Sequence, residues 1–230
     1  MAKLNNDIIK NTTLLSDLRE EDIDKIKSEL RLKTFERGEY IFRSGDAAEL
    51  MYIIKSGAMK ISMDLSDGRE QILYIYKEED FVGGLNLITN DEYVYNGIAL
   101  TDTEVLIISK SAFYNTLLDN KSFLRGLLVE SYERIRKSEQ LIDRLCVING
   151  DMKVAKGIIN LIDTHGAKNE KGNWVITPHL NRTEFGSFTG LTRETLTRKL
   201  AYFQEMGYVR LLPKGAIEII DLDSLNDLTV

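Results

Sequence analysis

The stretch Thr-Glu-Phe-Gly-Ser-Phe-Thr-Gly-Leu-Thr-Arg-Glu-Thr-Leu-Thr-Arg, residues 183–198, predicts two short helices joined by a tight turn. Gly190 suits the turn because glycine adopts the left-handed backbone conformation without steric cost. Thr192 is a favourable N-cap for the second helix. The apolar residues of that helix fall on one face, at Leu196, Leu200 and Phe203. This layout is typical of a helix-turn-helix, whose second helix enters the major groove of DNA.

The polar residues on the other faces of the second helix suit the reading of base pairs. Arg193 and Arg198 can each donate two parallel hydrogen bonds to a guanine, and Glu194 can accept one from a cytosine. The surrounding segment 182–214 holds six basic and three acidic residues, although the whole chain has a net charge of −6. A local basic surplus favours contact with nucleic acid. A solvated helix face with ordinary ion pairs is the alternative interpretation.

The residues around this motif complete a small domain. A helix is expected at 152–164, a short strand at 174–176, and a hairpin made of 208–212 and 216–220 around the turn Pro213-Lys214-Gly215. The hairpin and the strand together would form the wing of a winged helix-turn-helix. Asn149-Gly150 is predicted to end the preceding helix and to mark a domain boundary.

A long helix is predicted upstream, within residues 111–146. Its apolar and small residues are spaced alternately by four and by three over about three heptads, which is the seam of a coiled coil. The seam consists of Leu124, Leu128, Ser131, Ile135, Ser138, Ile142 and Leu145. A homodimer through this seam is one interpretation, and a helix packed on its own domain is the other.

The first half of the chain has a different texture. After a helix expected at 16–30, short β-rich runs alternate with turn residues. The runs are 39–42, 50–54, 59–65, 71–76, 94–100 and 104–108. Asp67-Gly68 between two such runs is a strong hairpin signal. Several short strands at this spacing predict a β-sandwich or barrel.

Composition excludes several function classes. The 230 residues include one cysteine, Cys146, and two histidines, His165 and His179, so an internal disulfide, a multi-cysteine metal site and an iron–sulfur cluster are ruled out. A metal-dependent enzyme on a β-roll needs histidines within the roll, and no catalytic constellation is indicated, so we expect neither enzyme nor cofactor. No apolar run is long enough to span a membrane, and we expect a cytoplasmic protein.

Residues 183–198 closely resemble the helix-turn-helix signature of the cyclic-AMP receptor protein / fumarate-nitrate regulator (Crp/Fnr) family of bacterial transcription regulators. The run Gly-Glu-Tyr-Ile-Phe…Gly-Asp…Met-Tyr-Ile-Ile…Ser-Gly, residues 38–57, resembles the sensor roll of the same family. The resemblance implies an α+β chain with three parts: a β-roll of the jelly-roll, cyclic-nucleotide-binding-like kind at 1–110, a dimerisation helix at 111–149 and a winged helix-turn-helix at 150–230.

The resemblance also implies how such a chain meets double-stranded DNA. By its pattern Arg193, Glu194 and Arg198 contact bases and Arg182 contacts a phosphate. We further predict DNA contacts from the remaining polar residues of the motif, Thr192, Thr195, Thr197 and Lys199. The target would be a palindromic site resembling TGTGA half-sites about one helical turn, roughly 34 Å, apart. RNA polymerase is the protein partner that family membership implies.

The sensor roll departs from the cyclic-nucleotide version of the family. There a Gly-Glu pair holds the ribose and an arginine holds the cyclic phosphate, whereas here Gly84 stands in place of the glutamate and no arginine lies between Arg69 and Arg125. A buried phosphate without a paired cation is costly, so we predict no cyclic-AMP binding. An unidentified small effector, or none, is left. The candidate effector-binding residues are Gly83, Gly84, Leu85, Tyr93, Tyr95 and Asn96, and Tyr52, Tyr74 and Tyr76 are further candidates for an apolar pocket.

A regulatory module that acts on a protein partner in place of DNA is the alternative function. The spacing and the basic surplus of the helix-turn-helix segment favour DNA.

Overall fold

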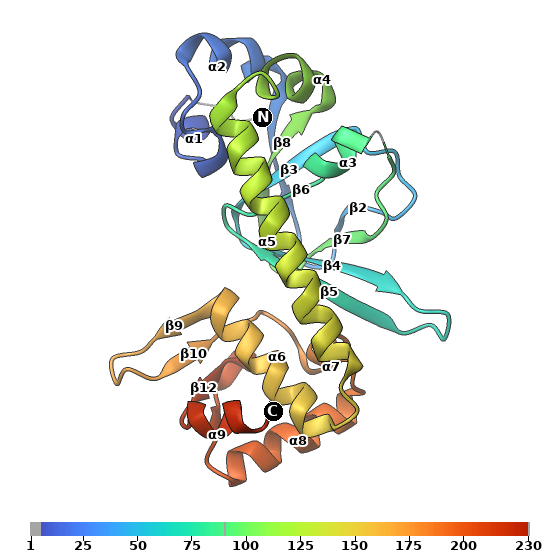
Figure 1. Ribbon diagram of the computed structural model, residues 1–230, viewed down its shortest axis with the longest axis vertical. Coiled ribbons are helices and arrows are strands. Elements are labelled where there is room, and N and C mark those ends of the chain that lie inside the picture. Colours follow the sequence, from blue (N-terminus) through green and yellow to red (C-terminus); the bar gives the residue numbers. More distant parts are fainter. Residues whose placement is uncertain (1–5, 90, 230) are drawn as a thin grey trace. The chain divides into compact units, whose positions relative to one another are not determined.

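The computed structural model describes residues 6–89 and 91–229 and divides the chain into two compact units. One unit holds the residues up to Met63 together with Tyr74–Arg136, and the other holds Asp64–Leu73 together with Lys137–Val230. Figure 1 shows the strands of the β-roll in the first unit. The second unit contains the helices of the helix-turn-helix domain, which is called the reader domain below. None of the described helices is long and apolar enough to cross a membrane.

Within residues 6–89 and 91–110, the roll has eight strands in two four-stranded sheets, with strand orders β1-β8-β3-β6 and β2-β7-β4-β5. The strands are β1 (Leu30–Phe35), β2 (Tyr40–Phe42), β3 (Leu50–Ser56), β4 (Ala58–Asp64), β5 (Glu70–Lys77), β6 (Phe81–Val82), β7 (Asn96–Ala99) and β8 (Thr103–Ser109). All six predicted β-runs are confirmed as strands. The strand β1 and the two-residue strand β6 were not among the predicted runs. The chain reverses between β4 and β5 at the predicted Asp67-Gly68, where Leu65 N donates to Arg69 O at 2.8 Å.

The N-terminal helical segment differs from its prediction. Instead of one helix over 16–30, the chain forms α1 (Asn6–Lys10), a 3-10 turn at Thr13–Leu15, α2 (Glu20–Ile26) and a 3-10 turn at Lys27–Glu29. The 3-10 turn buries Leu15, and Ser16 Oγ donates to Thr13 O at 2.9 Å in place of capping a helix. Ile9, Ile23 and Ile26 join the apolar core of the roll unit.

The long helix begins later than predicted. After α4 (Lys110–Ala112) and a π-helical turn (Phe113–Leu117), α5 runs over Lys121–Cys146. Phe113 and Leu117 are fully buried in the core of the roll unit, which holds the chain in a separate turn before the helix starts. Asn120 then accepts a hydrogen bond from Phe123 N at 2.9 Å at the beginning of α5.

The reader domain contains α6 (Gly150–His165), β9 (Gly166–Lys168), β10 (Trp174–Ile176), α7 (Arg182–Thr189), α8 (Arg193–Glu205), β11 (Val209–Leu211), β12 (Ile217–Ile219) and α9 (Leu222–Asp227). Its sheet has the order β11-β12-β10-β9, which joins the predicted hairpin to the predicted strand. The prediction that Asn149-Gly150 ends the long helix is wrong. α5 already ends at Cys146, and the Asn149 side chain caps α6 by accepting a hydrogen bond from Asp151 N at 2.9 Å.

Candidate nucleic-acid interface

The first helix of the motif, α7, is fixed by a reciprocal cap. Asn181 Oδ1 accepts hydrogen bonds from the backbone N of Thr183 and of Glu184, both at 2.9 Å. Glu184 Oε2 in turn accepts from Asn181 N at 2.9 Å. This is a capping box, which satisfies backbone donors that a helix start otherwise leaves unpaired. Sequence reasoning missed it, although an Asn followed three residues later by a Glu is a signal that could have found it.

Two glycines shape the turn between α7 and α8. Gly190 lies in the left-handed region, with φ 70° and ψ 30°, as predicted. Gly186 is needed for close approach, since a Cβ there would lie 2.7 Å from Leu191 O. The same place is bridged by a hydrogen bond of 2.9 Å from Leu191 N to Gly186 O. The turn therefore draws the start of α8 tightly against α7.

The second helix, α8, has the predicted cap and the predicted inner face. Thr192 Oγ1 accepts from Thr195 N at 3.2 Å. Leu196, Leu200 and Phe203 are fully buried. Because the inner face is anchored in the core, the orientation of the outer face is fixed as well.

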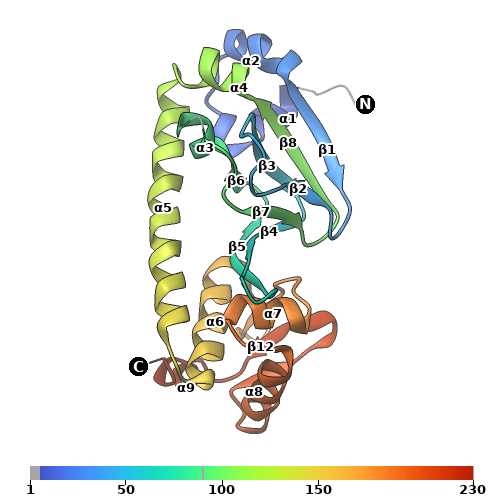
Figure 2. The same ribbon diagram turned by 90° about the vertical axis from the view of Figure 1, so that its right-hand side faces the viewer.

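The outer face of the first turns of α8 is open to solvent. Its exposed residues are Thr192, Arg193, Glu194, Thr197 and Arg198. Thr197 Oγ1 donates to Arg193 O at 2.7 Å, and Thr195 is half-buried next to the cap. Two arginines and one glutamate are thus exposed in the first two turns of α8. Figure 2 shows α8 next to α7.

Two of the predicted contact residues are partly withdrawn from solvent. Lys199 is half-buried, and its Nζ forms an ion pair with Asp151 Oδ2 at 2.8 Å, which ties α8 to α6. Arg182, at the start of α7, is half-buried, and burial lowers the pKa of its guanidinium. Arginine remains charged at neutral pH despite such a shift. The structure therefore gives Lys199 a role inside the domain and leaves Arg182 cationic.

The sheet of the wing is held by one buried carboxylate. Glu218 on β12 accepts hydrogen bonds from Asn169 Nδ2 and Asn173 Nδ2, both at 2.9 Å, and pairs with Arg210 Nη1 at 2.9 Å. The hydrogen bonds from the two asparagines, followed by the charge of Arg210, lower the pKa of Glu218. This node connects the β9–β10 turn to β12, and β12 to β11. Sequence reasoning did not identify it.

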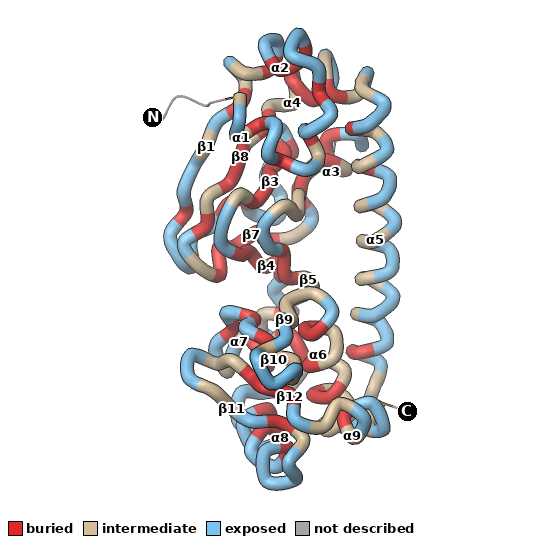
Figure 3. The backbone as a smooth tube through the Cα atoms, turned by 90° about the vertical axis from the view of Figure 1, so that its left-hand side faces the viewer, coloured by how far each residue is buried: buried red, intermediate tan, exposed pale blue. Residues whose placement is uncertain are grey.

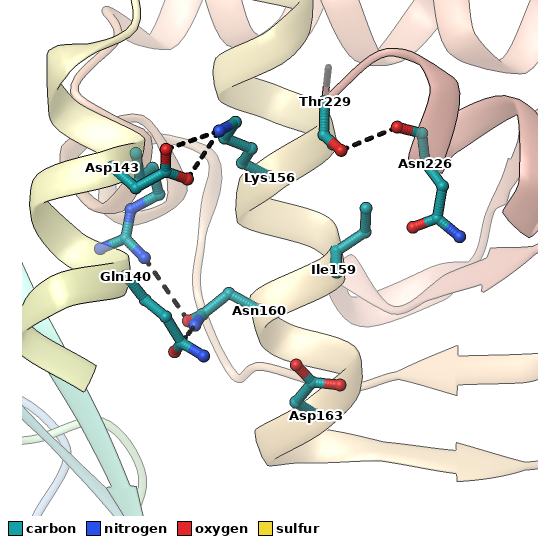
Figure 4. Close-up of a pocket in the computed structure, with 9 residues that line it drawn as sticks. Gln140, Asp143, Lys156, Ile159, Asn160, Asp163, Asn226 and Thr229 are labelled. Carbon is teal, nitrogen blue, oxygen red and sulfur yellow. Dashed lines mark hydrogen bonds and ion pairs between the residues drawn. The ribbon is translucent and has the colours of Figure 1, made fainter. Parts of the chain in front are cut away.

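The C-terminal part of α5 is bound to α6 around a polar pocket of about 190 Å³, drawn in Figure 4. Lys156 Nζ contacts both carboxylate oxygens of Asp143, at 2.6 and 2.7 Å, and Asn160 Nδ2 donates to Gln140 Oε1 at 2.8 Å. Arg144 is buried beside them, with its guanidinium 3.9 Å from the centre of the Phe188 ring on α7. These contacts join the last turns of α5 to the reader domain.

Another face of α5 carries apolar side chains in contact with solvent. Leu128, Ile135 and Ile142 of the predicted seam are 70%, 58% and 62% exposed, and neighbouring Tyr132 is 60% exposed. The other seam residues, Leu124, Ser131, Ser138 and Leu145, are half-buried. Figure 3 shows exposed and half-buried segments along most of this helix. An apolar stripe of this kind on one helix is typical of a surface that pairs with another protein.

The residues predicted to bind an effector lie in two neighbouring segments of the roll. Gly83 follows β6, Gly84 and Leu85 begin the short helix α3 (Gly84–Thr89), and Asn96 begins β7. Tyr93 is 4% exposed, with its hydroxyl 2.6 Å from Leu50 O, whereas Tyr95 is half-buried. Tyr52 lies near Tyr93, with ring centres 6.3 Å apart.

The two other candidate tyrosines, Tyr74 and Tyr76, lie on β5. Their ring centres lie 6.2 Å apart with the planes tilted by 50°, and burial raises the pKa of Tyr76 to about 12. A separate cavity of about 310 Å³ in the roll unit is lined by residues from the N-terminal turns, the β5–β6 turn and α5. Its lining includes Leu14, Phe81 and Arg125, none of which was a candidate. Within the described residues no three His, Cys, Asp or Glu side chains gather in a group suited to a metal ion.

A β-roll followed by a long helix and a winged helix-turn-helix defines a class of transcription regulators. In this class one polypeptide carries both the sensor domain and the DNA-binding domain. Two family models match the chain in this order. Residues 32–120 match the cyclic nucleotide-binding domain, and residues 152–228 match the Crp-like helix-turn-helix domain. The chain belongs to the Crp/Fnr family of transcription regulators, so the predicted family and fold class are confirmed. The family and fold are those of regulators and not of enzymes.

Relatives span nearly the whole chain. A CRP-like cAMP-activated global transcriptional regulator of Mycobacterium tuberculosis is 25% identical over 92% of this chain and 94% of its own length. An anaerobic regulatory protein of Bacillus subtilis is 27% identical over 91% of this chain and 89% of its own length. Among solved structures, FixK2 from Bradyrhizobium japonicum superposes with a TM-score of 0.76 at 21% identity, covering 87% of this chain and 98% of FixK2. That likeness concerns the fold.

Proposed function

We propose that this regulator binds a palindromic DNA site as a homodimer and reads TGTGA-like half-sites with α8. The observation that carries the proposal is the exposed group of Arg193, Glu194 and Arg198 on a helix whose opposite face is fully buried. Bidentate arginine–guanine contacts and a glutamate–cytosine contact are the base contacts that these side chains form best. Thr192 and Thr197 are exposed beside them, and the cationic Arg182 is suited to a phosphate.

The dimer is supported by the apolar stripe of α5. Leu128, Ile135 and Ile142 recur at coiled-coil spacing and are all more than half exposed. Two such stripes bury each other in a parallel pair, and a two-fold axis along the pair repeats the reader on the DNA. The two-fold symmetry of the protein then requires a palindromic site.

The same proposal holds that cyclic AMP does not control this chain. The relative from Mycobacterium tuberculosis is described as cAMP-activated. Here Gly84 stands where the cyclic-nucleotide version has a glutamate that binds the ribose. Tyr93 lies in the region where that version has the arginine that binds the phosphate. Glycine has no side chain that could accept the ribose hydroxyls, and the neutral phenol of tyrosine cannot neutralise a phosphate.

As a transcription regulator the protein would act in the cytoplasm and contact RNA polymerase when bound near a promoter. The match to the Crp-like helix-turn-helix domain supports both proposals. An effector, where one exists, could change DNA binding only by preferring one of two arrangements of the chain.

The test is binding of the purified protein, without added ligand, to a palindromic TGTGA-type duplex and to a scrambled duplex at the same salt concentration. Fluorescence anisotropy should show selective binding by the wild type. The double variant Arg193→Ala, Arg198→Ala should lose about 2–6 kcal/mol of binding free energy per half-site, since each half-site loses two bidentate contacts worth about 1–3 kcal/mol each.

Arg31→Ala is the matched control, because Arg31 is an exposed arginine on β1 of the roll. It should bind the palindrome as the wild type does. Unchanged affinity in the double variant would remove the two arginines from the interface. Equal binding of both duplexes by the wild type would contradict sequence-specific reading under these conditions.

A further inference from the structure

Three aromatic rings from three separate segments meet inside the roll. Phe42 comes from β2, Tyr52 from β3, and Tyr93 from the segment between α3 and β7. The ring centres of Phe42 and Tyr93 lie 4.3 Å apart with the planes stacked, and those of Phe42 and Tyr52 lie 5.5 Å apart. The three residues are only 4–7% exposed. The cluster is therefore part of the core and not the lining of an open pocket.

The hydroxyl of Tyr93 is satisfied within the chain. It donates to Leu50 O at 2.6 Å and accepts from Leu50 N at 3.3 Å. Burial, followed by the neighbouring Tyr52, raises the pKa of Tyr93. Because the ordinary pKa of a tyrosine is already about 10, the phenol is protonated and keeps its donor at neutral pH. A ring with a satisfied hydroxyl pays little for its burial.

The backbone around Tyr93 is joined to the loop between β2 and β3. Gly45 N donates to Tyr93 O at 2.8 Å, and Tyr93 N donates to Asp46 O at 2.9 Å. On either side, Ala48 N donates to Asp91 O at 3.2 Å and Ser44 Oγ donates to Val94 O at 2.9 Å. The two loops are held together over several residues, so Tyr93 cannot swing outward as a side chain on a free loop would.

The surrounding glycines show how little space is left. A Cβ on Gly97 would lie 2.6 Å from two ring carbons of Phe42 and 2.9 Å from Met59 Cε. A Cβ on Gly83 would lie 2.6 Å from Leu50 O and 3.4 Å from the Tyr93 ring. A site in which a single methyl group clashes has no room for a nucleotide while the rings stay in place.

We propose that Tyr93 acts as a built-in ligand of the roll: its phenol ring occupies the interior and keeps the roll closed without a bound effector. The proposal rests on one part of the proposed function, the exclusion of cyclic AMP as an effector. It does not depend on whether the chain binds DNA. It assigns the interior to a phenol-sized group that the chain itself supplies.

The experiment removes the phenol and returns it as a free molecule. Tyr93→Ala should lower the melting temperature by on the order of 10 °C, since it deletes a buried aromatic ring. Adding phenol, which is the part of the tyrosine side chain that alanine lacks, should raise the melting temperature of this variant with saturation. Benzene, which lacks the hydroxyl that bonds Leu50, should raise it less.

Tyr95→Ala is the matched control, because Tyr95 lies two residues away and is only half-buried. Neither Tyr95→Ala nor the wild type should respond to phenol. A response of the wild type equal to that of Tyr93→Ala, or no response of a folded Tyr93→Ala, would overturn the proposal. So would a rise in the melting temperature of the wild type with cyclic AMP, provided that the rise is lost in Tyr93→Ala.

A second measurement uses the wild type and needs no stable variant. Nitration by tetranitromethane, mapped by mass spectrometry, should modify the exposed Tyr202 and leave Tyr52 and Tyr93 unmodified in the native protein. Nitration of native Tyr93 at the rate of Tyr202 would show that the interior is open. Because neither measurement contains DNA, failure here is distinct from failure of the DNA-binding test.

Discussion

The roll and the reader domain treat their candidate sites in opposite ways. In the roll, Tyr93 turns inward, is 4% exposed and has its hydroxyl bonded to the backbone of Leu50. In the reader domain, Arg193, Glu194 and Arg198 turn outward and are exposed. A side chain that already has its partners inside the chain cannot recognise an outside molecule, whereas an exposed group on a rigid helix can. The candidate DNA-binding face of α8 is thus open to solvent, whereas the interior of the sensor roll is filled by the chain's own side chains.

The largest effect is expected at the apolar stripe of α5. The interior of the roll is filled by its own residues, whereas the stripe needs a second copy of the chain to cover it. Ile135→Asp places a carboxylate in the apolar seam of both copies, where an unpaired charge is strongly unfavourable. We expect a monomer in sedimentation equilibrium at micromolar concentration and about a 100-fold weaker affinity for the palindrome, since the two readers are no longer linked.

Arg136→Asp is the control for the seam, because Arg136 is exposed on the same helix but lies off the stripe. It should remain a dimer. A dimeric Ile135→Asp would show that the copies pair elsewhere. In either variant the nitration pattern of the roll should be unchanged, which separates the closed roll from the dimer.

The next effect tests how tightly the roll is filled. Gly97→Ala introduces the methyl group that meets the Phe42 ring at 2.6 Å. Overpacking of this kind costs about 1–3 kcal/mol of unfolding free energy, to be measured by urea denaturation. In Gly150→Ala the new methyl group meets only Lys199 Cε at 3.5 Å, so a change within about 0.5 kcal/mol is expected. Equal losses in the two variants would mean that the interior has space to spare.

The same two regions differ in how far the sequence could predict them. The reader was predictable because its determinants are local: a glycine in the turn, Thr192 at the cap, and an inner face at Leu196, Leu200 and Phe203. The filled roll was not, because Phe42, Tyr52 and Tyr93 are brought together only by the pairing of distant segments. Tyr93 was named from the sequence as a pocket residue, but nothing local showed that its ring turns inward onto Leu50.

The long helix shows the same limit. Its seam spacing was visible in the sequence, and all seam residues lie on α5. Its start was not visible, because the π-helical turn before it is held by the burial of Phe113 and Leu117 in the roll core. The ion pair between Lys199 and Asp151 likewise joins residues far apart in the sequence. Spacing identified Lys199 as a polar helix residue but could not show its partner.

A smaller, pH-dependent effect is expected at Glu218 in the wing. Its buried carboxylate has hydrogen-bond partners inside the chain, as the hydroxyl of Tyr93 has in the roll. The hydrogen bonds from Asn173 and Asn169 lower the pKa of Glu218 below its ordinary value of 4.5. A lowered pKa in the folded state adds stability above the ordinary value, and that stability is lost as the pH falls through the folded pKa. Glu218→Gln should therefore be less stable than the wild type at neutral pH, with the difference closing in acid.

Thermal unfolding at a series of pH values checks this prediction. Glu170→Gln is the control, since Glu170 is exposed in the β9–β10 turn, and its difference from the wild type should stay flat with pH. A Glu218→Gln difference that stays constant through the acid range would show that the node contributes by packing alone. Such a result would weaken the likeness between the paired carboxylate in the wing and the paired phenol in the roll.

The smallest effect is expected at the cap of α7, and it tests whether the reader is held by local contacts. Asn181→Ala removes the two hydrogen bonds that Asn181 Oδ1 accepts from the backbone N of Thr183 and Glu184. Loss of an N-cap costs about 1 kcal/mol, to be measured by urea denaturation against Thr183→Ala, which leaves Asn181 in place. Because Phe185 and Phe188 of α7 remain in the core, α8 should keep its orientation and the affinity for the palindrome should change by less than about threefold. A much larger loss of DNA binding at this small cost in stability would mean that the reading face depends on the cap itself, and that the open site is less rigid than the closed one.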